Sequence, residues 1–166
     1  MCSLSPLATH GCRSATRCTT KTGVQFLTYT DEAYPERLRE IFDPPALLWL
    51  RGNPQVLALP SIAVVGTRHP SPYGTGMAQM LSRDLAHRDL IILSGMARGV
   101  DTSAHKGSLA AERPTIAVWG TGIDVIYSKE NRSLSEQIIA AEALSGPSFR
   151  YESFLRRKIF LNAIAF

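Results

Sequence analysis

Glycine and basic residues follow three apolar stretches of the chain. Of all residues in the sequence, these have the types and spacing best suited to binding a ligand. The first group spans residues 66–74 and places Arg68 two residues after the end of an apolar run. A guanidinium and the free amides that open a helix both suit an anion such as phosphate. An alternative is that Arg68 pairs with a nearby carboxylate while the glycines only turn the chain. The candidate binding residues here are Gly66, Thr67, Arg68 and Gly74.

A second and a third glycine-bearing segment begin at Ser94 and at Gly120. Their glycines permit close approach of the backbone or a positive φ. Exposed amides and the Ser94 hydroxyl could hold a phosphate, as helix N-termini and backbone nests do. The candidate residues in these two segments are Ser94, Gly95, Arg98, Gly120 and Gly122.

No residue pattern specifies a nucleophile, a metal site or a general base, so we predict no catalytic residue, no metal and no cofactor. Asp101 is expected to cap the helix that follows it, and His105 to be a structural histidine. The three cysteines, near His10, lack zinc-ligand spacing. Thiols in a flexible tail are favoured over a weak metal site. The cysteines are Cys2, Cys12 and Cys18.

Three apolar runs with β-branched residues, each followed by a helical pattern, position these loops. The runs are 61–66, 90–93 and 115–119, and the helices are expected over about 74–88, 102–112 and 133–143. Such alternation predicts an α/β fold, Rossmann-like, with three α/β/α layers and a parallel sheet. In open sheets of this kind ligands bind at the carboxyl ends of the strands.

The expected helices carry two further local signals. Met77, Met80, Leu81 and Leu85 form one apolar stripe on the first helix, which should face the sheet. Ser133 with Glu136 fits a capping box at the start of the third helix.

The chain divides into four parts. Residues 1–22 read as a disordered leader, 23–60 as an N-terminal lead-in, 61–143 as the first half of a Rossmann-like core, and 144–166 as a divergent basic and aromatic tail. No clear strand or helix emerges in the tail, which resembles a truncated or frameshifted ending. The strand at 61–66 would then lack a neighbour on one side, and we expect an open sheet edge and a loose tail.

Charge and hydropathy exclude some classes of protein. The net charge is +4, with most of the excess in the first 22 and the last 24 residues, so a phosphate-binding surface must be built locally. No apolar run approaches the ~20 residues of a membrane span, and no secretory signal is present. We therefore expect a cytoplasmic protein with no membrane association.

Several motifs in one order resemble the DNA-processing protein A (DprA/Smf) family over about residues 26–142. They are the segments 64–68, 73–74, 94–101 with His105, and 115–124 with Tyr127 and Asn131. Tyr34-Pro35, upstream of these motifs, also resembles the family. Departures are Ser128 where the family usually has proline, and a tail without the family's later motifs.

The resemblance implies an extended Rossmann fold that binds single-stranded DNA without catalysis. It also implies protection of incoming DNA in natural transformation, loading of a RecA-type recombinase, and the homodimer that the family forms. By the same resemblance Arg68 matches a DNA-contacting arginine, and the region of Lys129 and Arg132 matches a second basic contact.

Two alternatives remain. Nucleotide-processing enzymes of the LOG or lysine-decarboxylase-like type share a Rossmann-like shape, but their Pro-Gly-Gly-x-Gly-Thr loop is absent from this sequence. The other alternative is a non-functional fragment.

Overall fold

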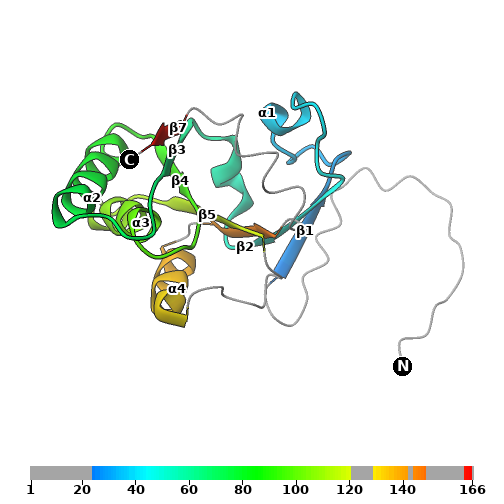
Figure 1. Ribbon diagram of the computed structural model, residues 1–166. Helices are drawn as coiled ribbons and strands as arrows, with labels where there is room; N and C mark the ends of the chain where they lie inside the picture. The colour runs from blue at the N-terminus through cyan, green and yellow to red at the C-terminus, as the bar shows by residue number, and fades with distance from the viewer. Residues whose placement is uncertain (1–23, 121–128, 142–143, 149–162, 166) are drawn as a thin grey trace, which may run out of the picture.

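The computed structural model describes residues 24–120, 129–141, 144–148 and 163–165, which form one seven-stranded sheet with flanking helices (Figure 1). The strand order is β1-β2-β6-β5-β4-β3-β7. The predicted α/β, Rossmann-like fold is confirmed. The cysteine-containing leader lies outside the described residues.

The three predicted apolar runs form the centre of the sheet as parallel strands. They are β3 (Ser61–Val65), β4 (Ile91–Ser94) and β5 (Thr115–Trp119). Ile62 pairs with Ile92, and Leu93 pairs with Ile116. Both faces of these strands are buried, which is why the runs are continuously apolar instead of alternating.

The expected open edge beside β3 is wrong, because β7 (Ala163–Ala165) pairs with β3 in parallel. The other tail strand, β6 (Leu144–Ser148), lies between β2 and β5. The segment of β6 contains glycine and proline and β7 has only three residues, so neither shows the continuous apolar run that marks β3, β4 and β5 in the sequence. Their backbone hydrogen bonds to neighbouring strands define them.

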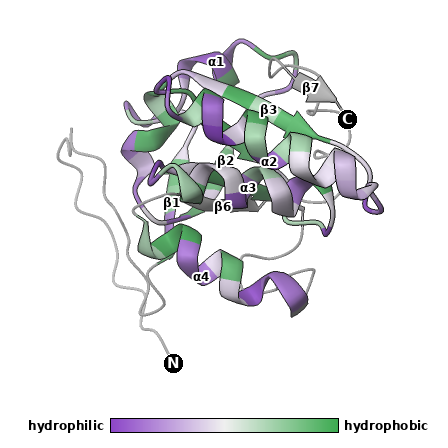
Figure 2. Cartoon of the chain, turned by 90° about the vertical axis from the view of Figure 1, so that its left-hand side faces the viewer, coloured by the Kyte–Doolittle hydropathy of each residue, from purple (hydrophilic) through white to green (hydrophobic). Residues whose placement is uncertain are grey.

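The helices α2 (Pro72–Ala86), α3 (Val100–Ala110) and α4 (Arg132–Ala140) lie on one face of the sheet (Figure 1). One apolar cluster joins Val64 and Ile92 of the strands to Ala78 and Ala104 of the helices. Figure 2 shows both hydrophobic and hydrophilic residues along α4, whose Leu134 is buried against the sheet. Of the described residues, no helix combines the length and the apolar character that a membrane crossing requires.

The lead-in adds two strands to the sheet, and residues between and after these strands pack on the face opposite to α2, α3 and α4. It consists of β1 (Val24–Thr28), α1 (Glu36–Arg39), β2 (Leu47–Arg51) and the 3-10 helix η1 (Pro54–Ala58). Tyr34 is buried there, and its hydroxyl donates to the Pro45 carbonyl over 2.8 Å. Tyr34 and Val56 pack there in one apolar cluster with Ala63 and Leu93 of the central strands, so short segments and not a row of long helices cover this face.

The predicted apolar stripe on α2 is only half-buried, with Leu85 packed against the apolar cluster, and the fully buried positions of the helix are others. Ala78, Ser82 and Ala86 are fully buried, whereas Met80 is exposed. The reason is the close packing of α2 on α3, which small residues permit and long side chains would prevent. A Cβ atom on Gly107 of α3 would overlap the Gln79 carbonyl oxygen of α2.

Two predicted helix caps are also wrong. The helix α3 begins at Val100, with Gly99 at the N-cap, so Asp101 lies inside the first turn. Asn131 precedes α4, and Ser133 lies within that helix, where its hydroxyl contacts the Gln137 amide. In both cases contacts between loops fix the helix start one or two residues earlier than local signals indicated.

The packing of α2 on α3 predicts opposite effects for two glycine substitutions. Gly107→Ala should lower the free energy of unfolding, because the added Cβ meets the α2 backbone. Gly76→Ala should raise it by about 0.5–1 kcal/mol, because alanine favours a helix and a Cβ there meets nothing within 4 Å. Urea unfolding curves of both variants measure the difference, and equal stabilisation by both would contradict this packing.

Candidate functional site

The loop after β3 and the loop after β4 are in direct contact at the carboxyl edge of the sheet. Gly99 adopts φ +91°, and its Cα lies so close to the first loop that a Cβ would come within 2.5 Å of the Thr67 carbonyl oxygen. That carbonyl accepts a hydrogen bond from the Val100 amide over 3.2 Å. The predicted need for glycine is confirmed at this position, and the two loops form one surface.

Exposed basic groups from both loops meet on this surface. Residues 66–69 are exposed, as is Arg98. The Arg98 Nη2 atom lies 2.8 Å from Nε2 of His69, and because a guanidinium only donates, this His69 nitrogen accepts. Arg68 of the first loop and Arg98 of the second therefore belong to the same edge of the sheet.

Asn131 connects the second loop to the start of α4. Its side chain is buried, and its amide nitrogen donates to the Met96 carbonyl over 3.1 Å and to the Thr102 hydroxyl over 3.0 Å. The Thr102 hydroxyl in turn contacts the Ala97 carbonyl over 2.9 Å. This network fixes the second loop and the segment that carries Lys129 and Arg132 relative to each other.

The start of α2 differs from the expected open N-terminus at Gly74. The helix begins at Pro72, and Ser71 is its N-cap. The Gly74 amide donates to the Ser71 hydroxyl over 3.1 Å, and the Thr75 amide to the Ser71 carbonyl over 2.9 Å. The Gly74 amide is thus already satisfied within the protein and is not offered to a ligand.

The other predicted residues occupy different environments. Ser94 is buried, and its hydroxyl donates to the Val64 carbonyl over 2.7 Å, so it links β4 to β3. Gly120 is half-buried, and Gly122 lies outside the described residues. Lys129 is in the 3-10 helix η2 (Lys129–Asn131), and Arg132 is exposed, with its Nε 3.7 Å from Glu136.

Two polar residues in this region are buried beneath the surface. Asp101 is buried, with its carboxylate against Gly95. His105 is fully buried; its Nε2 donates to the Gly95 carbonyl over 2.9 Å, and its Nδ1 lies 2.8 Å from the Thr115 hydroxyl. Burial lowers the pKa of His105 to about 4, although the Gly95 hydrogen bond opposes this shift. The neutral ring supports the structural role predicted for it.

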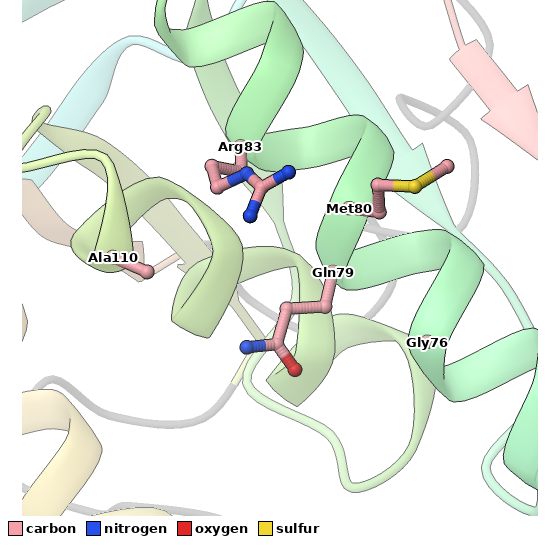
Figure 3. A pocket seen from close by; sticks show the side chains of 5 residues that line it. All are labelled: Gly76, Gln79, Met80, Arg83 and Ala110. Carbon is pink, nitrogen blue, oxygen red and sulfur yellow. The ribbon is translucent and has the colours of Figure 1, made fainter.

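A shallow pocket lies apart from this edge, on the helical layer. Gly76, Gln79, Met80, Arg83 and Ala110 line it (Figure 3). The Arg83 guanidinium in this pocket forms an ion pair, since its Nε atom is 3.3 Å from the Asp84 carboxylate. In the parts of the chain that the structure describes, no group of three or more histidine, cysteine, aspartate or glutamate residues could hold a metal ion.

Comparison with known proteins identifies the family of the chain. The family model for DNA recombination-mediator protein A matches residues 25–165. The chain belongs to this family. Curated relatives include the DNA processing protein DprA of Streptococcus pneumoniae, 44% identical over 108 residues, which covers 65% of this chain and 38% of the relative. Protein Smf of Synechocystis is 42% identical over 124 residues, which covers 72% of this chain and 31% of that relative.

Solved structures of the DprA/Smf family share the fold. The X-ray structure of DprA from Streptococcus pneumoniae matches with a TM-score of 0.67 and 38% identity, over 74% of this chain and 43% of that chain. DprA from Helicobacter pylori, solved to explain its single-stranded DNA binding mode, matches with a TM-score of 0.66 and 31% identity, over 80% of this chain and 62% of that chain. This chain therefore spans less than two thirds of the length of these relatives.

Sequence reasoning missed three contributors to this edge. His69 contacts Arg98, Asn131 fixes the second loop, and Ser71 caps α2. Ser71 stands before a proline, a signal for a helix start that was available in the sequence. The other two contacts join residues 29 and 35 positions apart, and no local pattern indicates them.

The burial of His105 predicts a loss of stability in acid. Its pKa is about 4 in the folded protein against 6.5 when exposed, so the unfolded chain binds the proton more readily. The stabilisation is complete above pH 6.5 and is lost as the pH falls towards 4, by about 3 kcal/mol. Urea unfolding at pH 7.5 and pH 4 measures it.

Two variants test whether His105 causes the loss of stability at low pH. His105→Gln should reduce the difference between the two pH values, whereas His87→Gln, at an exposed histidine, should retain it. The same pH dependence in both variants would show that His105 is not responsible.

Proposed function

We propose that this protein binds single-stranded DNA without catalysing a reaction, in DNA uptake and recombination. The observation that carries the proposal is the exposed basic edge formed by Arg68 and Arg98 on two interlocked loops. Binding of a single strand without sequence preference requires basic groups along the backbone, which such an edge supplies. The H. pylori relative, described as binding single-stranded DNA, supports the same conclusion.

The proposed contacts follow the carboxyl edge of the sheet. Arg68 and Arg98 would bind phosphates, and Lys129 and Arg132 would continue the path beside the third loop. Arg132 would exchange its exposed partner Glu136 for phosphate at little expense, since such ion pairs contribute less than about 1 kcal/mol. Residues whose backbone would allow close approach of the strand are Gly66, Thr67, Gly120 and Gly122, whereas at Gly95 the Asp101 carboxylate takes this space. Ser94 and Gly74 are left out, because their polar groups are used within the protein.

The proposal that the protein is not an enzyme rests on the surroundings of its titratable groups. His105 and Asp101 are buried below the loops, and His105 has protein partners at both ring nitrogens. Neither is placed to exchange a proton with a substrate on the surface. The remaining expectations, which are a RecA-type recombinase as partner, a homodimer and a place in the bacterial cytoplasm, are proposed from the family alone.

Arg68→Ala should weaken binding to a labelled 20-nucleotide strand, such as dT20, by roughly 10-fold, because one charged phosphate contact is lost. The slope of log affinity against log salt should fall by about 0.7, the value for one phosphate on a single strand. Fluorescence anisotropy over a range of salt concentrations measures both quantities.

A matched control is Arg88→Ala, which removes the same charge from an exposed arginine at the amino ends of the strands. It should leave the affinity nearly unchanged. Equal losses of affinity in the two variants would show that the effect arises from net charge alone. An unchanged affinity of Arg68→Ala would show that Arg68 does not contact the DNA.

The enzyme alternative predicts turnover of a nucleotide. We expect no release of adenine or phosphate from AMP, and no cleavage of single-stranded DNA with or without divalent metal. Chromatographic product analysis after long incubation at high protein concentration is the measurement. Turnover that disappears in both Asp101→Asn and His105→Gln, with each variant still folded, would establish the enzyme instead.

A further inference from the structure

Tyr73 presents an aromatic ring to solvent from a fixed position beside the basic edge. Its side chain is 76% exposed. It lies in the first turn of α2, between the proline that begins the helix and the capped Gly74 amide. The Thr75 hydroxyl adds a bond to the Ser71 carbonyl over 3.1 Å. The backbone that carries the ring is thus ordered before any ligand binds, which reduces the entropy lost on binding.

Of the other exposed aromatic residues of the described chain, Phe42 is 97% exposed but belongs to the lead-in, and the remaining two have partners within the protein. Trp49 packs against Phe26 with ring centroids 5.9 Å apart. Tyr29 packs against Tyr34 at 5.6 Å, and the Arg39 guanidinium lies 5.7 Å from its ring. Within the described ranges, Tyr73 has no ring or cation partner and is available to a flat ligand.

The charge around Tyr73 suits a polyanion. No aspartate or glutamate occurs between residues 44 and 83, and this stretch includes the first loop and most of α2. Arg68 and His69 precede Tyr73 by five and four residues, and His69 contacts Arg98 of the second loop. A phosphate held by these groups would carry its sugar and base towards the start of α2.

We propose that Tyr73 is a base-stacking platform that makes this site select single strands. The inference rests on the proposed DNA binding and adds the feature that arginines alone cannot supply. Guanidinium groups bind the phosphates of single and double strands alike, whereas an aromatic ring requires a base that is not stacked within a duplex. Every base has a π face, so a stacking platform favours single strands without reading their sequence.

The experiment compares three 20-mers with the full chain: dT20, an abasic strand of the same length, and a duplex. Tyr73→Ala should weaken dT20 binding by about 5- to 150-fold, the range for one stacked base. It should leave the abasic strand and the duplex unchanged. Tyr73→Phe should bind as the wild type, because the ring is retained. Phe42→Ala, which removes another exposed aromatic ring far from the loops in sequence, is the matched control and should have no effect.

A spectroscopic reading separates stacking from general loss of affinity. A strand with one 2-aminopurine should lose fluorescence on binding to the wild type and to Tyr73→Phe, but not when Tyr73→Ala is saturated with it. Because Tyr73 is exposed, its replacement should not change the stability of the fold, and thermal melting of each variant measures this.

The outcomes distinguish this inference from the proposed function. If Arg68→Ala weakens all three ligands and Tyr73→Ala weakens none, the site binds DNA and Tyr73 is not a platform. If Tyr73→Phe loses as much as Tyr73→Ala, the hydroxyl and not the ring makes the contact, and the proposal is overturned. If the wild type binds none of the three, the proposed function itself is wrong.

Discussion

The candidate surface depends on the close approach of two backbone segments at Gly99. The Thr67 carbonyl oxygen and the Arg68 backbone occupy the space that a side chain would need, and φ +91° excludes most other residues. Through this contact the loop after β3 rests on the loop after β4, and the Val100 amide secures it. Arg68 and Arg98 would otherwise stand on separate flexible loops, and any anion that bound both would have to order them first.

Buried polar groups hold the same edge from below. Ser94 links β4 to β3, His105 links the Gly95 carbonyl to Thr115, and Asn131 links Met96 to α4. Each of these groups is buried and has a partner, as buried polar groups must, because an unpaired one costs about 1–3 kcal/mol. The hydrogen bonds of these polar groups therefore hold the loops in position. His105, a residue type often used in catalysis, supports the surface from below and is not part of it.

The proposed site divides recognition between two kinds of group on one rigid support. In this proposal, guanidinium groups on the loops would bind phosphate through charge, and the ring at the start of α2 would contact a base. Both depend on where α2 begins and how it lies, which follows from the Ser71 cap and from the small residues that pack α2 on α3. The shallow pocket on the outer side of these helices has a paired arginine and takes no part in this arrangement.

The sequence alone determined the alternation of apolar strands and helices, the glycine-bearing loops at one edge, and the family, because continuous apolar runs and ordered motifs are local properties. Only the tertiary structure decided which residues of α2 are buried, since the close contact of Gly107 with the Gln79 carbonyl and Ser82 buries Ser82 and leaves Met80 exposed. It also decided that segments 144–148 and 163–165 are strands, because one contains glycine and proline, the other has only three residues, and only pairing with β5 and β3 defines them. The same reason applies to the site: contacts such as His69 with Arg98 join residues distant in sequence, and only folding brings them together.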